Sequence, residues 1–196
     1  MVELHARRAQ LDKIRAGNEL IPRFRPRLEI DASPSRAFGN LQFIGYFVDE
    51  IDFDNARPGK GTNLSLSGTW RADDHTNLTF TGSTRWVNVD DPSLGSGRLF
   101  TASLGRARGT YMFNSKCFAR LIGQYLQTDR DPSLYTFPVT LRSAGLSLSG
   151  LFAYKLNWQT VFYAGYGDDS AYSDTTTELE RARQQAFLKV SYAWQH

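Results

Sequence analysis

Residues 187–196 read FLKVSYAWQH, and their polarity alternates along the whole stretch. Every second residue is apolar and polar or small residues lie between them; the apolar set is Leu188, Val190, Tyr192 and Trp194. A period of two is typical of a β-strand with one apolar face, because successive side chains point to opposite sides of a strand. Most chain ends are loose unless the fold holds them. The stretch therefore predicts either a strand of a soluble sandwich or the closing strand of a barrel.

The chain has 196 residues, enough for one domain with a sizeable core or for part of a larger protein. Its 23 basic and 20 acidic residues give a net charge of only +3, and the basic residues are scattered. Nucleic-acid-binding proteins usually gather their basic residues into one patch, so no nucleic-acid partner is expected. The single cysteine, Cys117, excludes an intramolecular disulfide and disfavours a cysteine-based zinc site.

No apolar run approaches the roughly 20 residues that a membrane-spanning helix needs. The first residues, MVELHARRAQLDKIRAG, are too charged for a secretory signal peptide. The mean hydropathy of −0.42 by itself suggests a soluble protein. This inference does not extend to transmembrane β-barrels, because their strands alternate lipid-facing and lumen-facing residues and averaging hides the apolar face.

Alternation with a period of two begins near residue 22 and predicts nine strands. They are expected at 22–32, 39–53, 62–71, 76–89, 98–113, 117–128, 139–156, 159–168 and 184–195. Several exceed the usual strand length of about 5–6 residues and suit a tilted crossing of a membrane. Residues 1–21 are expected to be a short, weak helix or a disordered leader, and residues 22–196 an antiparallel β-barrel segment.

The predicted connections alternate between short and long. Short turns are expected at 72–75, 114–116 and 157–158, and longer polar links at 54–61, 90–97, 129–138 and 169–183. Outer-membrane barrels have short turns at one rim and longer loops at the other. The alternation therefore favours a barrel over a soluble meander.

Aromatic residues gather near both ends of the predicted strands. The set near the short turns is Trp70, Tyr111, Phe113, Tyr154, Trp158, Tyr192 and Trp194, and the set near the longer links includes Trp86, Tyr125 and Tyr166. Tyr and Trp prefer membrane–water interfaces, where an apolar ring and a polar tip are both satisfied. Two aromatic girdles that flank an apolar band indicate a transmembrane β-barrel.

Alternation also predicts a polar, lumen-facing side of the strands. Six arginines are expected there: Arg71, Arg85, Arg106, Arg108, Arg120 and Arg142. An arginine that faced lipid would cost about 2–4 kcal/mol near the midplane of the bilayer. In a lumen these side chains could pair with carboxylates, the simpler interpretation, or favour anionic solutes.

Three stretches carry a resemblance to a known family: YMFNSKCFARLIGQYLQ (111–127), GLFAYKLNWQTVFYAGYGDD (150–169) and QAFLKVSYAWQ (185–195). They resemble the C-terminal β-barrel, a domain of unknown function, of Gram-negative outer-membrane proteins. In those proteins the barrel follows a carbohydrate-binding-like β-sandwich of the family 9 type, and they are often labelled membrane-associated hydrolases. The resemblance implies that this chain is the C-terminal part of a longer protein with more strands. It also implies recognition of the last strand by the barrel-assembly machinery, although the chain ends on His196 and not on an aromatic residue.

No catalytic motif is present: the chain has no GxSxG, HExxH, P-loop or CxxC pattern. His5, His75 and His196 are far apart in the chain, so no metal site and no cofactor are predicted. Acidic residues of the longer links, such as Asp90 and Asp91, are expected to be solvated, with Ca²⁺ binding as the sharper alternative. We therefore expect no catalytic residue in this segment, whatever the activity of a longer parent protein.

The sequence thus predicts an all-β fold, an antiparallel up-and-down transmembrane β-barrel of about eight or nine strands or the C-terminal part of one. Its expected place is the outer membrane of a Gram-negative bacterium, in contact with lipid. It would act as a membrane anchor or as a passage for a solute, which the inward arginines suggest is anionic and the family resemblance implies is glycan-related. The alternative is a soluble β-sandwich or a lipocalin-like ligand-binding module, whose aromatic residues would lie in the middle of the strands.

Overall fold

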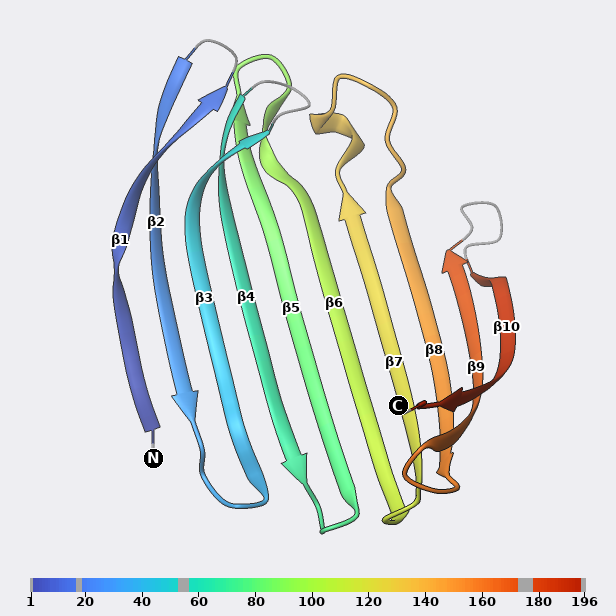
Figure 1. Ribbon diagram of the computed structural model, residues 1–196. Helices are drawn as coiled ribbons and strands as arrows, with labels where there is room; N and C mark the ends of the chain where they lie inside the picture. Colours follow the sequence, from blue (N-terminus) through green and yellow to red (C-terminus); the bar gives the residue numbers. More distant parts are fainter. Residues whose placement is uncertain (1, 17–18, 53–56, 173–177, 195–196) are drawn as a thin grey trace.

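The computed structural model describes residues 2–16, 19–52, 57–172 and 178–194, with side chains described from residue 26 onward. These residues form one ten-stranded antiparallel sheet in which each strand pairs with the next strand along the chain (Figure 1). The strands are β1 (Val2–Ala16), β2 (Glu19–Ala32), β3 (Phe38–Asp52), β4 (Arg57–Arg71), β5 (Thr76–Asp91), β6 (Gly95–Asn114), β7 (Cys117–Arg130), β8 (Arg142–Lys155), β9 (Thr160–Tyr172) and β10 (Leu179–Tyr192).

The predicted all-β antiparallel architecture is confirmed. The nine strands expected after residue 22 correspond to β2–β10, because a sustained period of two is read reliably from sequence. The last strand ends at Tyr192, and its predicted final residue, Gln195, lies outside the described residues.

The N-terminal prediction was wrong. Where a short helix or a disordered leader was expected, residues 2–16 form β1, which pairs with β2 from Val2↔Ala32 to Ala16↔Glu19 around one irregularity between Arg7 and Gln10. Helix propensity is a weak preference that tertiary pairing overrides, and here the hydrogen bonds to β2 decide the conformation.

The sheet is not closed into a barrel. In the described part of the chain, β1 and β10 each pair with a single neighbour, so both outer edges are open (Figure 1). Closure would require these two edges to pair with each other, together with a matching stagger of the strands. An all-β antiparallel meander is therefore established, and the closed barrel is not.

The two ends of the sheet differ, although less regularly than predicted. The end that carries residues 33–37, 72–75, 115–116 and 156–159 is called the turn end, and the opposite end, at the top of Figure 1, is called the loop end. The links predicted at 54–61 and 90–97 are largely strand, because their polar residues pair with neighbouring strands beyond the apolar region; residues 53–56 lie outside the described residues. Residues 131–141 form the longest connection between the described strands and contain a 3₁₀ turn, η1 (Pro132–Leu134).

Local side-chain capping explains the tight turns. Asp73 accepts hydrogen bonds from the backbone N–H groups of His75 and Thr76, both at 2.7 Å, and from the Thr76 hydroxyl at 3.1 Å. Asn157 accepts in the same way from the backbone N–H groups of Gln159 and Thr160. Asp and Asn favour such turns because their short side chains satisfy backbone donors that lack a strand partner.

The sheet is a single layer with almost no core. The accessible surface is 13491 Å², whereas a compact soluble chain of 22.2 kDa would expose about 9,400 Å². Soluble domains are usually built from two or more packed layers, because a sheet must bury its apolar face. No helix among the described residues is long and apolar enough to cross a membrane.

We predict that Asp73→Asn lowers stability and changes its pH dependence. The backbone N–H of His75 and the Thr76 donors hold the pKa of the Asp73 carboxyl below its ordinary value. A depressed folded-state pKa means that the carboxylate stabilises the fold above the unfolded pKa of about 3.9, and that this contribution is lost as the pH falls through the folded pKa.

Urea unfolding, followed by tryptophan fluorescence, should therefore give a lower midpoint urea concentration for Asp73→Asn than for the wild type at pH 7. This difference in midpoint should become smaller below about pH 4. A difference that is the same at both pH values would contradict this assignment. Asp74→Asn is the matched control, because it changes the adjacent carboxylate of the same turn.

Candidate functional site

Register divides the side chains into two faces of opposite character. Residues that pair directly across an antiparallel ladder lie on the same face. One row contains Ile30, Phe43, Leu66, Gly82, Gly105, Tyr125 and Leu146, and its side is called the apolar face. The adjacent row contains Asp31, Gln42, Ser67, Thr81, Arg106, Gln124, Ser147 and Asp169, and its side is called the polar face.

The apolar face is exposed over many strands. Leu121 on β7 is 69% exposed, and Leu188 on β10 is 87% exposed. A groove in this face has small residues at its floor, Ala107, Gly109 and Gly123, and is bordered by larger side chains such as Trp70. Isolated exposed apolar residues are common in soluble proteins, but a continuous apolar face of this size marks a surface that meets lipid or another molecule.

The register places the predicted girdle aromatics of the strands on the apolar face. Those whose backbone register fixes the face are Trp70, Trp86, Tyr111, Tyr125, Tyr154, Tyr166 and Tyr192. Phe113 lies at a register irregularity of β6, and its ring packs edge-on against Tyr111 with centroids 4.9 Å apart. Trp158 is 64% exposed in a turn, and Trp194, just beyond β10, packs against Tyr192 at 6.2 Å.

The turn-end aromatics form a diagonal band. Its members lie on every second strand, β4, β6, β8 and β10, and are Trp70, Tyr111, Tyr154 and Tyr192. Each of these residues lies one same-face register row closer to the turn end than the one before it. Trp86, Tyr125 and Tyr166 drift in the same direction across β5, β7 and β9 at the other end of the strands. Register rows run perpendicular to the strands. In a barrel the strands are tilted relative to the barrel axis, so a band that slants across the rows can lie at one constant height along that axis.

Five of the six predicted arginines lie on the polar face: Arg71, Arg85, Arg106, Arg108 and Arg120. The placement of Arg142 was wrong. Arg142 pairs in register with Asp129 in the row of Trp86, on the apolar face at the loop end. Its Nε donates to Asp129 Oδ1 at 2.6 Å, which offsets the cost of an isolated charge on that face.

Carboxylates on the β2–β5 side of the polar face have basic or amide partners. Arg85 pairs with Glu50, and Arg27 donates to Glu29 at 2.9 Å. The amide of Gln42 bridges Glu29 and Asp31 at 3.1 and 2.9 Å. This part of the polar face is therefore close to charge-neutral.

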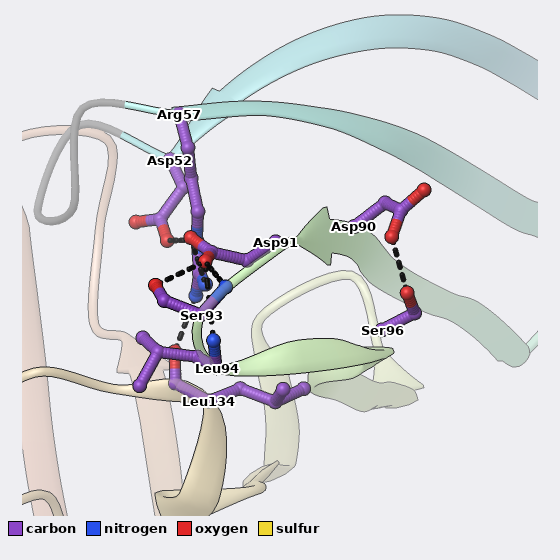
Figure 2. Close-up of polar contacts among 8 residues, drawn as sticks. All are labelled: Asp52, Arg57, Asp90, Asp91, Ser93, Leu94, Ser96 and Leu134. Atoms are coloured by element: carbon purple, nitrogen blue, oxygen red, sulfur yellow. Dashed lines mark hydrogen bonds and ion pairs between the residues drawn. The ribbon is translucent and has the colours of Figure 1, made fainter.

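A buried arginine joins three connections at the loop end (Figure 2). Arg57, the first residue of β4, donates from Nε to Asp52 Oδ2 at 2.9 Å and from Nη1 to Asp91 Oδ2 at 3.2 Å. Its Nη2 donates to the backbone carbonyl of Leu134 in η1. These four groups are called the Arg57 cluster.

The Arg57 cluster is desolvated. The side chains of Arg57 and Asp52 are 6% and 3% exposed, and that of Asp91 is 18% exposed. A planar guanidinium suits this place, because its fixed donors can serve two carboxylates and a carbonyl at once. Buried charges of this kind are tolerated only when each is paired and hydrogen-bonded.

The connection 131–141 folds back onto the polar face beside this cluster. Leu134 is 3% exposed and packs with Val87, Val89 and Leu99, the buried apolar cluster of the sheet. The carboxylate of Asp131 accepts from the backbone N–H and hydroxyl of Ser133, which fixes the turn that presents Leu134. The arrangement anchors the longest described connection across the ends of β4–β6.

Sequence reasoning missed the Arg57 cluster. The four residues of the cluster are spread over more than 80 positions. Arg57, Asp91 and Leu134 fall in stretches predicted to be solvated links, and Asp52 falls at the end of a predicted strand. One signal was available, because Asp91 begins a DPSL motif that recurs at residues 131–134. In both copies the aspartate accepts hydrogen bonds from the serine two residues later.

The described residues contain no group of three or more His, Cys, Asp or Glu side chains placed to hold a metal ion. His75 lies in the turn between β4 and β5, where its Nδ1 is 2.6 Å from the carbonyl of Met112. His196 is outside the described residues, and no side chain is described at His5. Cys117 is a free cysteine at the start of β7.

We predict that Arg57→Met destabilises the fold by about 3–5 kcal/mol, because it leaves two carboxylates without their buried partner. Arg142→Met is the matched control. The side chains of Arg142 and Asp129 are 51% and 39% exposed, and an exposed pair of this kind contributes about 0–1 kcal/mol. Equal losses for the two variants in urea unfolding would show that the Arg57 cluster does not hold the loop end together.

Comparison with known proteins identifies no relative: no protein-family model, curated protein or solved structure matches this chain. The resemblance to the outer-membrane barrel domain therefore stays a prediction from sequence.

Proposed function

We propose that this chain is the membrane-embedded part of a Gram-negative outer-membrane β-barrel, serving as an anchor or as a passage for a solute. The observation that carries the proposal is the single-layer sheet with one exposed, continuous apolar face. In water this face would have to be covered, and none of the described residues covers it. In a bilayer, lipid is the cover, and the polar face lines the interior.

The spacing of the aromatic residues supports a bilayer. In β5, Leu78 pairs with Trp70 near the turn end, and Trp86 lies eight residues further along the same face. At about 3.3 Å per residue this is about 26 Å along the strand. The lipid-facing band of outer-membrane barrels is about 25 Å tall, and tilt reduces the distance measured along the membrane normal.

The strand count supports closure of the sheet in a membrane. With ten strands in meander order, β1 and β10 run antiparallel, so a seam between them would have ordinary antiparallel pairing. If further strands belong to a longer protein, as the family resemblance implies, they would extend the same two edges. Either arrangement satisfies the backbone groups of edges that could not stay open in lipid.

The positions of the charged residues on the apolar face at the loop end also agree with lipid contact on this face. On β7, Asp129 lies two same-face rows beyond Tyr125 toward the loop end, so its pair with Arg142 stands at or beyond the level expected for the interface and not in the hydrocarbon. Arg98 also lies near this level, with its guanidinium over the Trp86 ring at 5.4 Å. The rows between Trp86 and Trp70 contain apolar, glycine and hydroxyl residues on this face of β4 and β5.

We predict opposite outcomes for Leu148→Arg and Ser149→Arg, adjacent residues near the middle of β8. Leu148 lies on the apolar face and is 49% exposed, whereas Ser149 lies on the polar face. An arginine facing lipid costs about 2–4 kcal/mol near the midplane, whereas an inward arginine is solvated. After refolding with phospholipid vesicles, Leu148→Arg should show a strong loss of vesicle co-flotation and Ser149→Arg should behave as wild type.

Equal flotation of both variants, or wild type that stays soluble without vesicles or detergent, would contradict the proposal and favour the soluble binding-module alternative. Unboiled samples on SDS–PAGE provide a second readout. A closed barrel resists SDS and migrates faster than the boiled chain, whereas an open sheet gives the same band in both lanes.

A further inference from the structure

Charge is divided unevenly along the polar face. Near the loop end, Glu50, Asp52 and Asp91 pair with arginines. Toward the turn end, the register rows of Arg106, Arg108 and Arg120 contain no carboxylate on strands β5 and β8. The two carboxylates of the Arg106 row, Asp31 and Asp169, lie further away on β2 and β9. In the described part of the chain none of these three arginines is within ion-pair distance of an acidic side chain. These three residues are called the arginine line.

Register fixes the spacing of the arginine line. Arg106 and Arg108 are same-face neighbours on β6, so their Cα atoms are about 6.7 Å apart. Arg108 pairs with Ile122 on β7, and Arg120 is the next same-face residue, which gives a diagonal separation of about 7–8 Å. The three cations therefore follow a path along β6 and then across to β7, not a compact triangle.

The surroundings of the arginine line are polar and neutral. Arg106 pairs in register with Thr81 and Gln124, and Arg108 donates to the Thr79 hydroxyl at 3.4 Å. Arg120 pairs with Thr110, and its guanidinium lies over the Phe118 ring at 5.5 Å. The Nε atom of Arg120 is buried and has no hydrogen-bond acceptor. Arg106 and Arg108 are exposed, so the guanidinium groups on this path remain able to bind an incoming acceptor.

We propose that the arginine line binds a small linear solute with two or more anionic groups, such as phosphates or sulfates. Guanidinium groups bind such oxyanions through parallel, charge-assisted hydrogen bonds, and neighbouring hydroxyls and amides supply further donors. Three cations whose Cα atoms follow a path in steps of about 7 Å suit an extended oligoanion better than the single charge centre of one phosphate ion. The inference deepens the proposed function, because it names the solute class that the polar face would accept.

The test measures binding to the refolded full chain in detergent by isothermal titration calorimetry, with inorganic tripolyphosphate as the extended probe and orthophosphate as the compact one. We expect tripolyphosphate to bind at least tenfold more tightly than orthophosphate. The variant Arg106→Gln/Arg108→Gln should weaken tripolyphosphate binding at least tenfold. The control Arg98→Gln/Lys116→Gln removes two positive charges away from the polar face and should change it less than twofold.

Equal loss in the two double variants would overturn the proposal, because general attraction by net charge would then explain the binding. Absence of tripolyphosphate binding to the wild-type chain would overturn it as well. Circular dichroism of each variant checks that it retains β-structure, and Arg106→Lys/Arg108→Lys, which keeps the charge without the planar donors, should recover binding in part. Titration in detergent needs no membrane crossing, so its outcome is independent of vesicle flotation.

Discussion

The register of backbone pairing between neighbouring strands is the constraint on which the rest of this structure depends. The described chain has little core, so hydrogen bonds between neighbouring strands hold most of it in place. Register also decides which side chains share a face, because a slip of one residue would move every side chain of a strand to the other face. The row from Asp31 to Asp169 and the adjacent row from Ile30 to Leu146 exist only because eight and seven strands, respectively, keep register with one another.

Interactions other than pairing concentrate at the loop end. The buried apolar cluster around Val87 and the Arg57 cluster both lie there, and both involve Leu134. One contributes non-directional burial, and the other contributes directed bonds that fix where η1 sits. The turn end depends instead on local capping by Asp73 and Asn157 and on aromatic packing such as the stacked pair Phe38 and Trp70 at 5.8 Å. Different interactions thus stabilise the two ends of the same strands: burial and buried ion pairs at the loop end, and turn capping and aromatic packing at the turn end.

Most of the fold could be predicted from the sequence because it follows one local rule, the period of two. That rule identified β2–β10, the apolar face and the placement of five arginines. It failed at Arg142, which belongs to the even-numbered apolar set of β8 but is polar, so residue type suggested the wrong side. It failed at β1, where helix formers and an irregularity near Arg7 obscure the alternation. The Arg57 cluster and the open edges of the sheet were not predicted, because both depend on contacts between residues far apart in the chain.

Strict pairing of each strand with its chain neighbours makes this sheet nearly one-dimensional. Stability in such a chain is close to a sum of nearest-neighbour interfaces, as in repeat proteins. Protection against amide hydrogen exchange should therefore grade along the sheet, highest in the central strands β5 and β6 and lowest at β10, whose side chains are exposed throughout. The contacts are also short in sequence separation, so hairpins can add one after another to a growing sheet without first closing a long loop.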